Sequence, residues 1–269
     1  LGDNYPFRPM DQGFHESLIH LSGGIGQVGD FTNYYKGNRS YFDPILWHNN
    51  EQKKYEGYCS DIFTDEAIKF IEDNKSNQFF CYLSFNAPHT PLQVPDKYYD
   101  LYKNVDPSVI SESEKISMTE KNILDAKRIY GMVTNIDDNV GKLVSKLKEL
   151  NIDKNTILIF MTDNGPQQFR YVSNLRGLKS SVYNGGIKVP FYLSYPKIHD
   201  AGLDLDNFSA HIDVLPSLLD LCDIETPKNI KIDGENFLNK STEERSFFSY
   251  WTRKSPELYQ NMSLNKGNY

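Results

Sequence analysis

The sequence is poor in cysteine and lacks long apolar or basic runs, and each lack excludes a class of protein. Its three cysteines, Cys59, Cys81 and Cys222, are far apart and odd in number, which argues against a disulfide framework or a C-x-x-C zinc site. No apolar run approaches the roughly 20 residues that a membrane helix requires. The net charge is −7, with 29 Lys and Arg against 36 Asp and Glu, so a nucleic-acid-binding protein is not indicated.

Length and composition favour a large globular α/β protein. With 269 residues, 39% of them hydrophobic, the chain can bury a substantial core. Three apolar runs have the length and residue content of strands, and they span residues 79–85, 157–161 and 189–193. Segments with helical spacing alternate with them, at about residues 60–71, 120–150 and 212–221. This alternation predicts a mostly parallel central sheet with helices on both faces.

We place a domain boundary near residue 222. Residues 1–222 hold the alternating pattern, behind an irregular first segment of residues 1–58 that is rich in Gly, Asn and Tyr. Residues 223–269 contain short segments with turn signals such as Asp233-Gly234, which predicts the beginning of a smaller C-terminal element. The chain opens on Leu1 without a Met, and we expect it to be truncated at both ends.

Polar motifs follow two of the predicted strands, and a third motif precedes the last one. N-A-P-H-T-P occupies residues 86–91, T-D-N-G residues 162–165, and R-G-L-K residues 176–179, with N-G-G-I-K-V-P at residues 184–190. Ligands in open α/β sheets gather at the carboxyl ends of the strands. We therefore expect the three loops to converge on one pocket.

Asp163 and Asn164 are candidate metal ligands. They offer a carboxylate and an amide oxygen at the end of a strand, which suits Ca²⁺ or Mg²⁺. An ordinary Asp-Asn-Gly turn is the alternative interpretation, because these residues tolerate turn conformations.

Lys179 and His89 are candidate contacts for an anion. A Lys supplies a point charge on a flexible stem, although Arg176 and Lys188 compete for the same role. His89 stands between two prolines, so it is either an aimed ring or a packed loop histidine. A solvated surface lysine is the plain alternative for Lys179.

Taken in this order, the three motifs resemble the middle and later part of a sulfatase of the arylsulfatase family. The segments 135–141 (N-I-D-D-N-V-G) and 211–221 (H-I-D-V-L-P-S-L-L-D-L) are similar to that family too, so the resemblance extends from Leu1 to about Trp251. It implies an alkaline-phosphatase-like α/β sandwich that hydrolyses aryl sulfates or sulfated glycans with Ca²⁺, Mg²⁺ being less favoured. By motif match, Asp163 and Asn164 would bind the metal, and the catalytic residues His89 and Lys179 would contact the sulfate.

The resemblance also shows what this chain does not contain. The family's nucleophile is a formylglycine made from the first residue of a C/S-x-P-S/A-R motif, and no such motif is present. The family's paired aspartates are missing too, while Leu1-Gly2 resembles the end of its G-K-W-H-L-G segment. We therefore expect the formylglycine to lie upstream and the 269 residues alone to be inactive. Smaller departures are Asn184 in place of Glu and Lys188 in place of Arg.

Two other functions remain open at this point. A phosphoesterase of the same superfamily could use the same oxygen-ligand corner, and a non-catalytic sulfatase-like protein could bind an anion or glycan without turnover. The family favours an extracytoplasmic location, which would be periplasmic, secreted or lysosomal. The sequence leaves the substrate and the oligomeric state undetermined.

Overall fold

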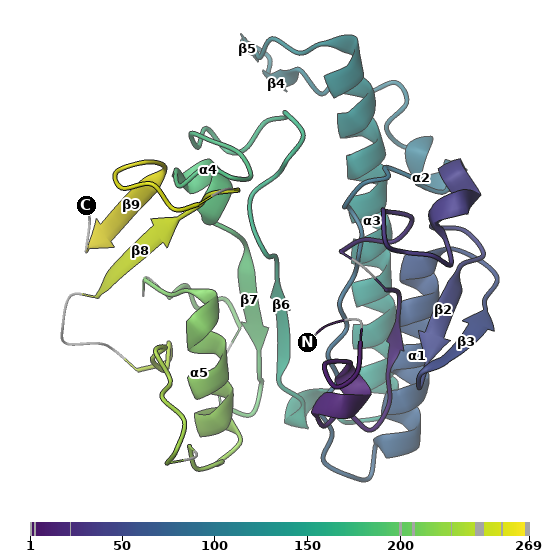
Figure 1. Cartoon of the computed structure of the whole chain (residues 1–269), viewed down its shortest axis with the longest axis vertical. Coiled ribbons are helices and arrows are strands. Elements are labelled where there is room, and N and C mark those ends of the chain that lie inside the picture. The colour runs from purple at the N-terminus through teal and green to yellow at the C-terminus, as the bar shows by residue number, and fades with distance from the viewer. Residues whose placement is uncertain are drawn as a thin grey trace. The chain divides into compact units, whose positions relative to one another are not determined.

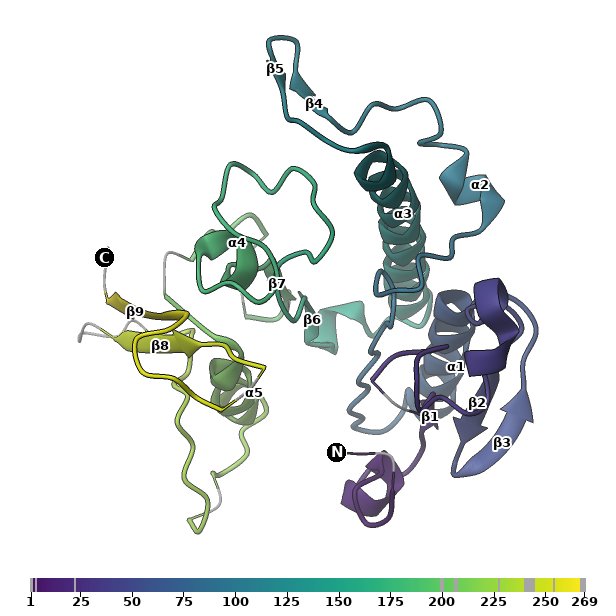
Figure 2. The same cartoon turned by 45° about the horizontal axis from the view of Figure 1, so that its top comes forward.

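The protein is described from a computed structural model of the chain, which Figures 1 and 2 show in two views. The structure describes residues 2, 4–21, 23–198, 201–205, 208–226, 228–239, 245–253 and 255–266. The chain forms two compact units, each described by itself. The first unit comprises residues 1–158, 168–174 and 195–197, and the second comprises residues 159–167, 175–194 and 198–269. The domain boundary expected near residue 222 stays a prediction.

The first unit is built on the long helix α3 (Glu120–Glu149), which the apolar stripe predicted. The hydroxyl oxygen of Thr119 caps the start of this helix. Helices α1 (Cys59–Asn74) and α2 (Asp96–Tyr99) pack against it, as both views show. The stripe is buried along most of its length, but Val133 faces solvent and is 47% exposed. No helix in the described part of the chain is both long and apolar enough to cross a membrane.

A small antiparallel sheet occupies part of the first segment, which the sequence indicated to be irregular. Its strands β1 (Leu18–Ile19), β2 (Ile45–His48) and β3 (Glu51–Lys54) are adjacent in that order. Strands of two to four residues are too short for alternation to be visible in the sequence. The remaining short elements of this unit are η1 (Pro9–Gln12), η2 (Tyr34–Arg39), β4 (Val109–Ser111), β5 (Glu114–Lys115) and η3 (Asp153–Asn155).

The prediction of a strand at residues 79–85 is wrong. The segment is extended and its side chains alternate in exposure, with Phe80 63% and Tyr82 68% exposed and Leu83 partly buried. A strand also needs a neighbouring chain with which to exchange backbone hydrogen bonds. Among the described residues none pairs with this segment. The extended conformation agrees with the strand-like residue content, whereas the pairing that a strand requires is not found among the described residues.

A buried polar cluster links α1 to α3. One carboxylate oxygen of Asp61 accepts hydrogen bonds from the side-chain amides of Asn135 (2.7 Å) and Asn139 (2.8 Å). Both amides are almost fully buried, so an acceptor between them removes a substantial desolvation cost. The segment from residue 135 to residue 141, one of those with a family resemblance, thus has a structural role in helix packing.

The second unit contains the later strands and helices. The predictions at residues 157–161, 189–193 and 212–221 correspond to β6 (Leu158–Met161), β7 (Phe191–Ser194) and α5 (Val214–Leu221). Strands β6 and β7 are neighbours in a two-stranded sheet. The C-terminal segment forms a hairpin. The unit's other elements are α4 (Asn184–Ile187), η4 (His211–Asp213), β8 (Ser246–Tyr250) and β9 (Met262–Lys266).

The α/β class holds for the described residues, but the mostly parallel central sheet is not confirmed. The sheets contain two or three strands each. All four pairings whose register the structure gives, β1 with β2, β2 with β3, β4 with β5 and β8 with β9, are antiparallel. The segment at residues 79–85, which was expected as one strand of that sheet, has no ladder partner among the described residues.

Candidate active site

The metal candidates lie where β6 ends, inside the second unit. Residues 163–165 form a bend, in which Asp163 is exposed and Asn164 is half-buried. The amide nitrogen of Asn164 donates to the carbonyl oxygen of Gly165 at 2.9 Å, so Oδ1 is the atom available for a cation. Nε2 of His211 donates to the carbonyl oxygen of Thr162 at 2.8 Å and so fixes the end of the strand. The corner is therefore fixed by hydrogen bonds and offers two oxygen donors, one from Asp163 and one from Asn164.

Glycines lock this corner against the loop that contains Lys179. The backbone nitrogen of Gly165 donates to the carbonyl oxygen of Gly186 at 2.8 Å, and that of Lys179 donates to Pro166 at 2.8 Å. A Cβ placed on Gly165 would overlap the carbonyl oxygen of Gly185, and one placed on Gly185 would overlap that of Gly177. Because only glycine allows so close an approach, the T-D-N-G and G-G motifs are parts of one interlocked structure.

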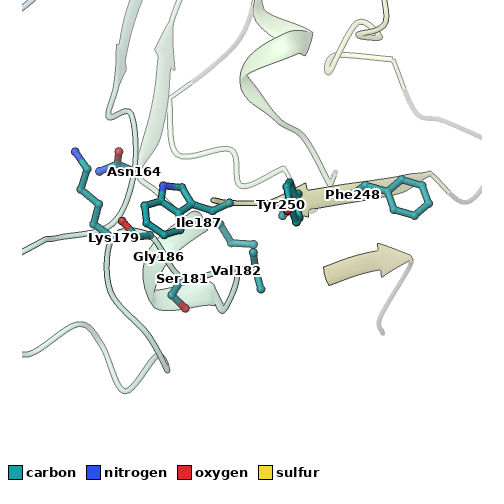
Figure 3. A pocket seen from close by; sticks show the side chains of 11 residues that line it. Asn164, Lys179, Ser181, Val182, Gly186, Ile187, Phe248 and Tyr250 are labelled. Carbon is teal, nitrogen blue, oxygen red and sulfur yellow. The ribbon is translucent and has the colours of Figure 1, made fainter. Parts of the chain in front are cut away.

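Asn164 and Lys179 line the same pocket, which Figure 3 shows from close by. Its volume is about 340 Å³, and Gly186 and Ile187 line it too. The side chains of Asn164 and Lys179 lie near each other at one side of it in the figure. The pocket therefore combines one cation with one amide.

The two cations that competed with Lys179 are placed elsewhere in the same unit. The guanidinium of Arg176 stacks on the ring of Tyr183 at 4.0 Å, and Lys188 is exposed. Neither is among the residues that line the pocket, and Asp163 is not among them either. Of the three candidate cations, Lys179 is therefore the one that lines this pocket.

His89 lies in the first unit, on the loop that follows the extended segment. Its Nδ1 donates to the carbonyl oxygen of Thr90 at 2.8 Å, which leaves Nε2 as the atom available to a ligand. The hydroxyl of Tyr41 donates to the carbonyl oxygen of His89 at 2.8 Å, and Gln27 donates to that of Thr90 at 2.8 Å. Burial raises the pKa of Tyr41, so it stays a neutral donor. These hydrogen bonds fix the orientation of the His89 ring. The expected convergence of His89 and Lys179 on one site stays a prediction.

Sequence reasoning missed several residues at or beside the site. His211 was left without a role, although the H-I-D-V-L-P segment that contains it was noted for its resemblance. Tyr250 and Trp251 also line the pocket, but they lie in the tail, where no motif singled them out. The only available signal for them was a pair of adjacent aromatic residues at the end of a short apolar run.

Together these features define an α/β protein in which a pocket of about 340 Å³ with one lysine adjoins an oxygen-donor corner. A family model described as sulfatase matches residues 9–224, and the chain therefore belongs to the sulfatase family. It is similar to the uncharacterised sulfatase YdeN of Escherichia coli (strain K12), with 30% identity over 218 residues covering 77% of this chain and 35% of that protein. It is also similar to an arylsulfatase of Hemicentrotus pulcherrimus, with 29% identity covering 91% of this chain and 42% of the relative.

Among solved structures, the chain is similar to Ps i-CgsB, crystallised in complex with k-i-k-neocarrahexaose. The TM-score is 0.72 and the identity 30%, over 88% of this chain and 51% of that one. The chain thus spans about half of this structure, and 35% and 42% of the length of the two curated relatives above. Its fold is that of the sulfatases, and family membership supports sulfate ester hydrolysis.

Proposed function

We propose that the chain is part of a sulfuric ester hydrolase that cleaves an aryl sulfate or a sulfated glycan with Ca²⁺. The observation that supports this proposal most directly is that Lys179 and Asn164, from two separate motifs, line one pocket. A cation about 4 Å from an anionic oxygen gains roughly 4 kcal/mol at an effective dielectric near 20. Lys179 would therefore stabilise charge on the sulfuryl group, and Nε2 of His89 would contact the sulfate or its leaving oxygen.

A Ca²⁺ ion fits the donors in kind, although two donors do not complete its shell. The carboxylate of Asp163 accepts no hydrogen bond and forms no ion pair within the described ranges, so it is available as a ligand. Calcium takes 6 to 8 oxygen ligands. Groups of three or more His, Cys, Asp or Glu side chains able to hold a metal do not occur among the described residues. Asp163 and Asn164 would thus hold the ion with further oxygen donors, and the bound ion would act as a Lewis acid on the sulfate.

We expect removal of Ca²⁺ from the intact enzyme by a chelator to abolish sulfate ester hydrolysis. Adding Ca²⁺ back restores the rate, and Mg²⁺ restores less of it. Asp163→Asn lowers the apparent Ca²⁺ affinity by at least about 10-fold, because a neutral amide replaces a charged ligand. The matched control is Asp204→Asn, an exposed Asp of the same unit, which leaves the affinity unchanged. Full activity in chelator-treated enzyme contradicts the calcium assignment.

We expect Lys179→Ala to lower kcat/KM of the intact enzyme on a sulfate ester by about 10²–10³-fold, the range seen when one transition-state donor is removed. Lys188→Ala removes an equal charge from an exposed position of the same loop and changes kcat/KM less than about 2-fold, because screening weakens distant surface charges. Steady-state kinetics of both variants distinguish a role of Lys179 in the pocket from a general effect of net charge. Equal losses in the two would mean that net charge, and not the pocket, carries the effect.

Two alternatives predict different measurements. A phosphoesterase of the same superfamily would hydrolyse phosphate esters faster than sulfate esters. A non-catalytic sulfatase-like protein would bind inorganic sulfate or a sulfated glycan in a manner that depends on Lys179, without turnover by the intact protein. Comparing sulfate and phosphate esters of the same alcohol separates all three readings.

A further inference from the structure

Three aromatic residues from β8 and its end line the pocket that contains Lys179, and they are Phe248, Tyr250 and Trp251. Tyr250 and Trp251 are 39% and 38% exposed, so part of each side chain is accessible. Figure 3 shows Lys179 and Asn164 at one side of the pocket and Tyr250 at the other. The pocket therefore has a charged side and an aromatic side, both built by the second unit.

Hydrogen bonds from side chains of the hairpin to backbone carbonyl oxygens tie the aromatic side to the charged side. The amide of Asn261 donates to the carbonyl oxygen of Ser180 at 2.9 Å and to that of Trp251 at 3.1 Å. Ser263 donates to the carbonyl oxygen of Val182 at 3.3 Å. Ser180 directly follows Lys179, so the β8–β9 hairpin is held at a fixed place beside that lysine. The aromatic side is a preformed wall, as ligand sites usually are.

The two rings are also held individually. The hydroxyl of Tyr250 accepts a hydrogen bond from the backbone nitrogen of Glu257 at 2.8 Å. The guanidinium carbon of Arg253 lies 5.6 Å from the centroid of the Trp251 ring, a cation–π distance. On the other face of the strand, Phe247 packs edge-on against Phe208 with 4.8 Å between ring centroids. The hairpin thus packs one face against Phe208 and presents Tyr250 on the other.

We propose that Tyr250 and Trp251 form a sugar-binding wall, and that the substrate is a sulfated saccharide whose pyranose ring packs on this wall while its sulfate meets Lys179. This inference rests on the proposed function and deepens it. A pyranose has a flat face of C–H groups, which suits the broad apolar surface of an aromatic ring. A volume of about 340 Å³ is at the lower end of ligand pockets, so it takes one sugar unit with its sulfate.

The first experiment uses the fluorescence of Trp251 in the 269-residue chain. The chain has two tryptophans, and Trp47→Phe leaves Trp251 as the single reporter. The indole N–H of Trp47 is buried without a hydrogen-bond partner among the described residues, so its removal costs no hydrogen bond. With Ca²⁺ present, galactose 6-sulfate is expected to change the emission in a saturable way. Absence of any change, together with absence of binding heat, overturns the proposal.

The second experiment compares affinities by calorimetry. Trp251→Ala is expected to weaken binding of galactose 6-sulfate by about 10-fold or more, as truncating a central aromatic anchor commonly does. Binding of inorganic sulfate is expected to stay unchanged in this variant, since Lys179, which would meet the sulfate, is retained. Trp251→Phe keeps a ring and recovers most of the affinity. Tyr259→Ala removes a 91% exposed aromatic residue of the same hairpin that does not line the pocket, and it has no effect.

The outcomes separate this inference from the proposed hydrolase. If Trp251→Ala binds the sulfated sugar as the parent chain does, the wall is wrong and the sulfatase proposal stands. If Trp251→Ala loses affinity for a phenyl sulfate but not for the sulfated sugar, the wall serves an aryl group and the substrate class is overturned. If the intact protein hydrolyses no sulfate ester but the chain binds galactose 6-sulfate through Trp251, the hydrolase proposal fails and the wall stands.

Discussion

The 269-residue chain by itself is expected to hydrolyse an aryl sulfate about 10⁶-fold more slowly than an arylsulfatase of the family, the cost measured when a hydrolase loses its nucleophile. A nucleophile must be activated by a base, a lowered pKa or a metal. Burial instead raises the pKa of Cys59 and of Cys81, which keeps both thiols protonated. Neither cysteine stands in the motif from which formylglycine is made.

The measurement is release of a coloured phenol by purified chain with Ca²⁺, beside an active arylsulfatase at equal concentration. Calorimetry with inorganic sulfate controls for a folded pocket, so that inactivity is not mistaken for unfolding. Turnover that rises with chain concentration, requires Ca²⁺ and disappears in Lys179→Ala would contradict the expectation.

Arg245→Met is expected to lower the free energy of unfolding of the second unit by about 3–5 kcal/mol, the cost of leaving a buried charge without its partner. Two guanidinium nitrogens of Arg245 each donate to one carboxylate oxygen of Asp213 at 2.9 Å. The side chain of Asp213 is fully buried and that of Arg245 is 15% exposed. Denaturant melts followed by circular dichroism measure the loss. Lys231→Met removes an exposed ion pair of the same unit, that with Asp233, and costs less than about 1 kcal/mol.

The same ion pair makes stability depend on pH. Burial alone would raise the pKa of Asp213, but hydrogen bonds from Arg245 and from the backbone nitrogens of Glu235 and Ala210 outweigh it and lower the pKa. A lowered folded-state pKa stabilises the protein above the unfolded value, near pH 4, and this stabilisation is lost as pH falls through the folded pKa. The parent chain should therefore lose stability below about pH 4. Arg245→Met should lose less over that interval, and an equal slope would contradict this account.

The sequence predicted those parts of the fold whose information is local. The stripe of α3 and the apolar run of β6 stand out because periodicity and length are properties of a single segment. The segment at residues 79–85 shows the limit, since its strand-like residue content is visible in the sequence but its hydrogen-bonding neighbour is not. Strands as short as β1 carry too few residues to show any period.

The residues of the site that lie in recognisable motifs could be predicted from the sequence. Asp163, Asn164 and Lys179 were singled out from two short motifs, and the fold places two of these residues in one pocket. Charge alone could not rank Lys179 above Lys188, because the ranking depends on which side chain the loop turns inward. The aromatic wall lies outside every motif, about 70 residues further along the chain, and only tertiary structure brings it beside Lys179.

The glycine interlock has a consequence for how this loop tolerates sequence change. The distance from the Asp163-Asn164 corner to the backbone of Lys179 is set by main-chain contacts at Gly165, Gly185 and Gly186, and not by side chains. Exposed side chains next to these glycines can therefore be substituted without changing the distance between the corner and the backbone of Lys179. Asn184 is such a position: it stands where the family usually has Glu, it is exposed, and its carbonyl oxygen accepts from the backbone of Lys188 whichever side chain it carries. Variation among relatives should thus concentrate between the glycines and spare them.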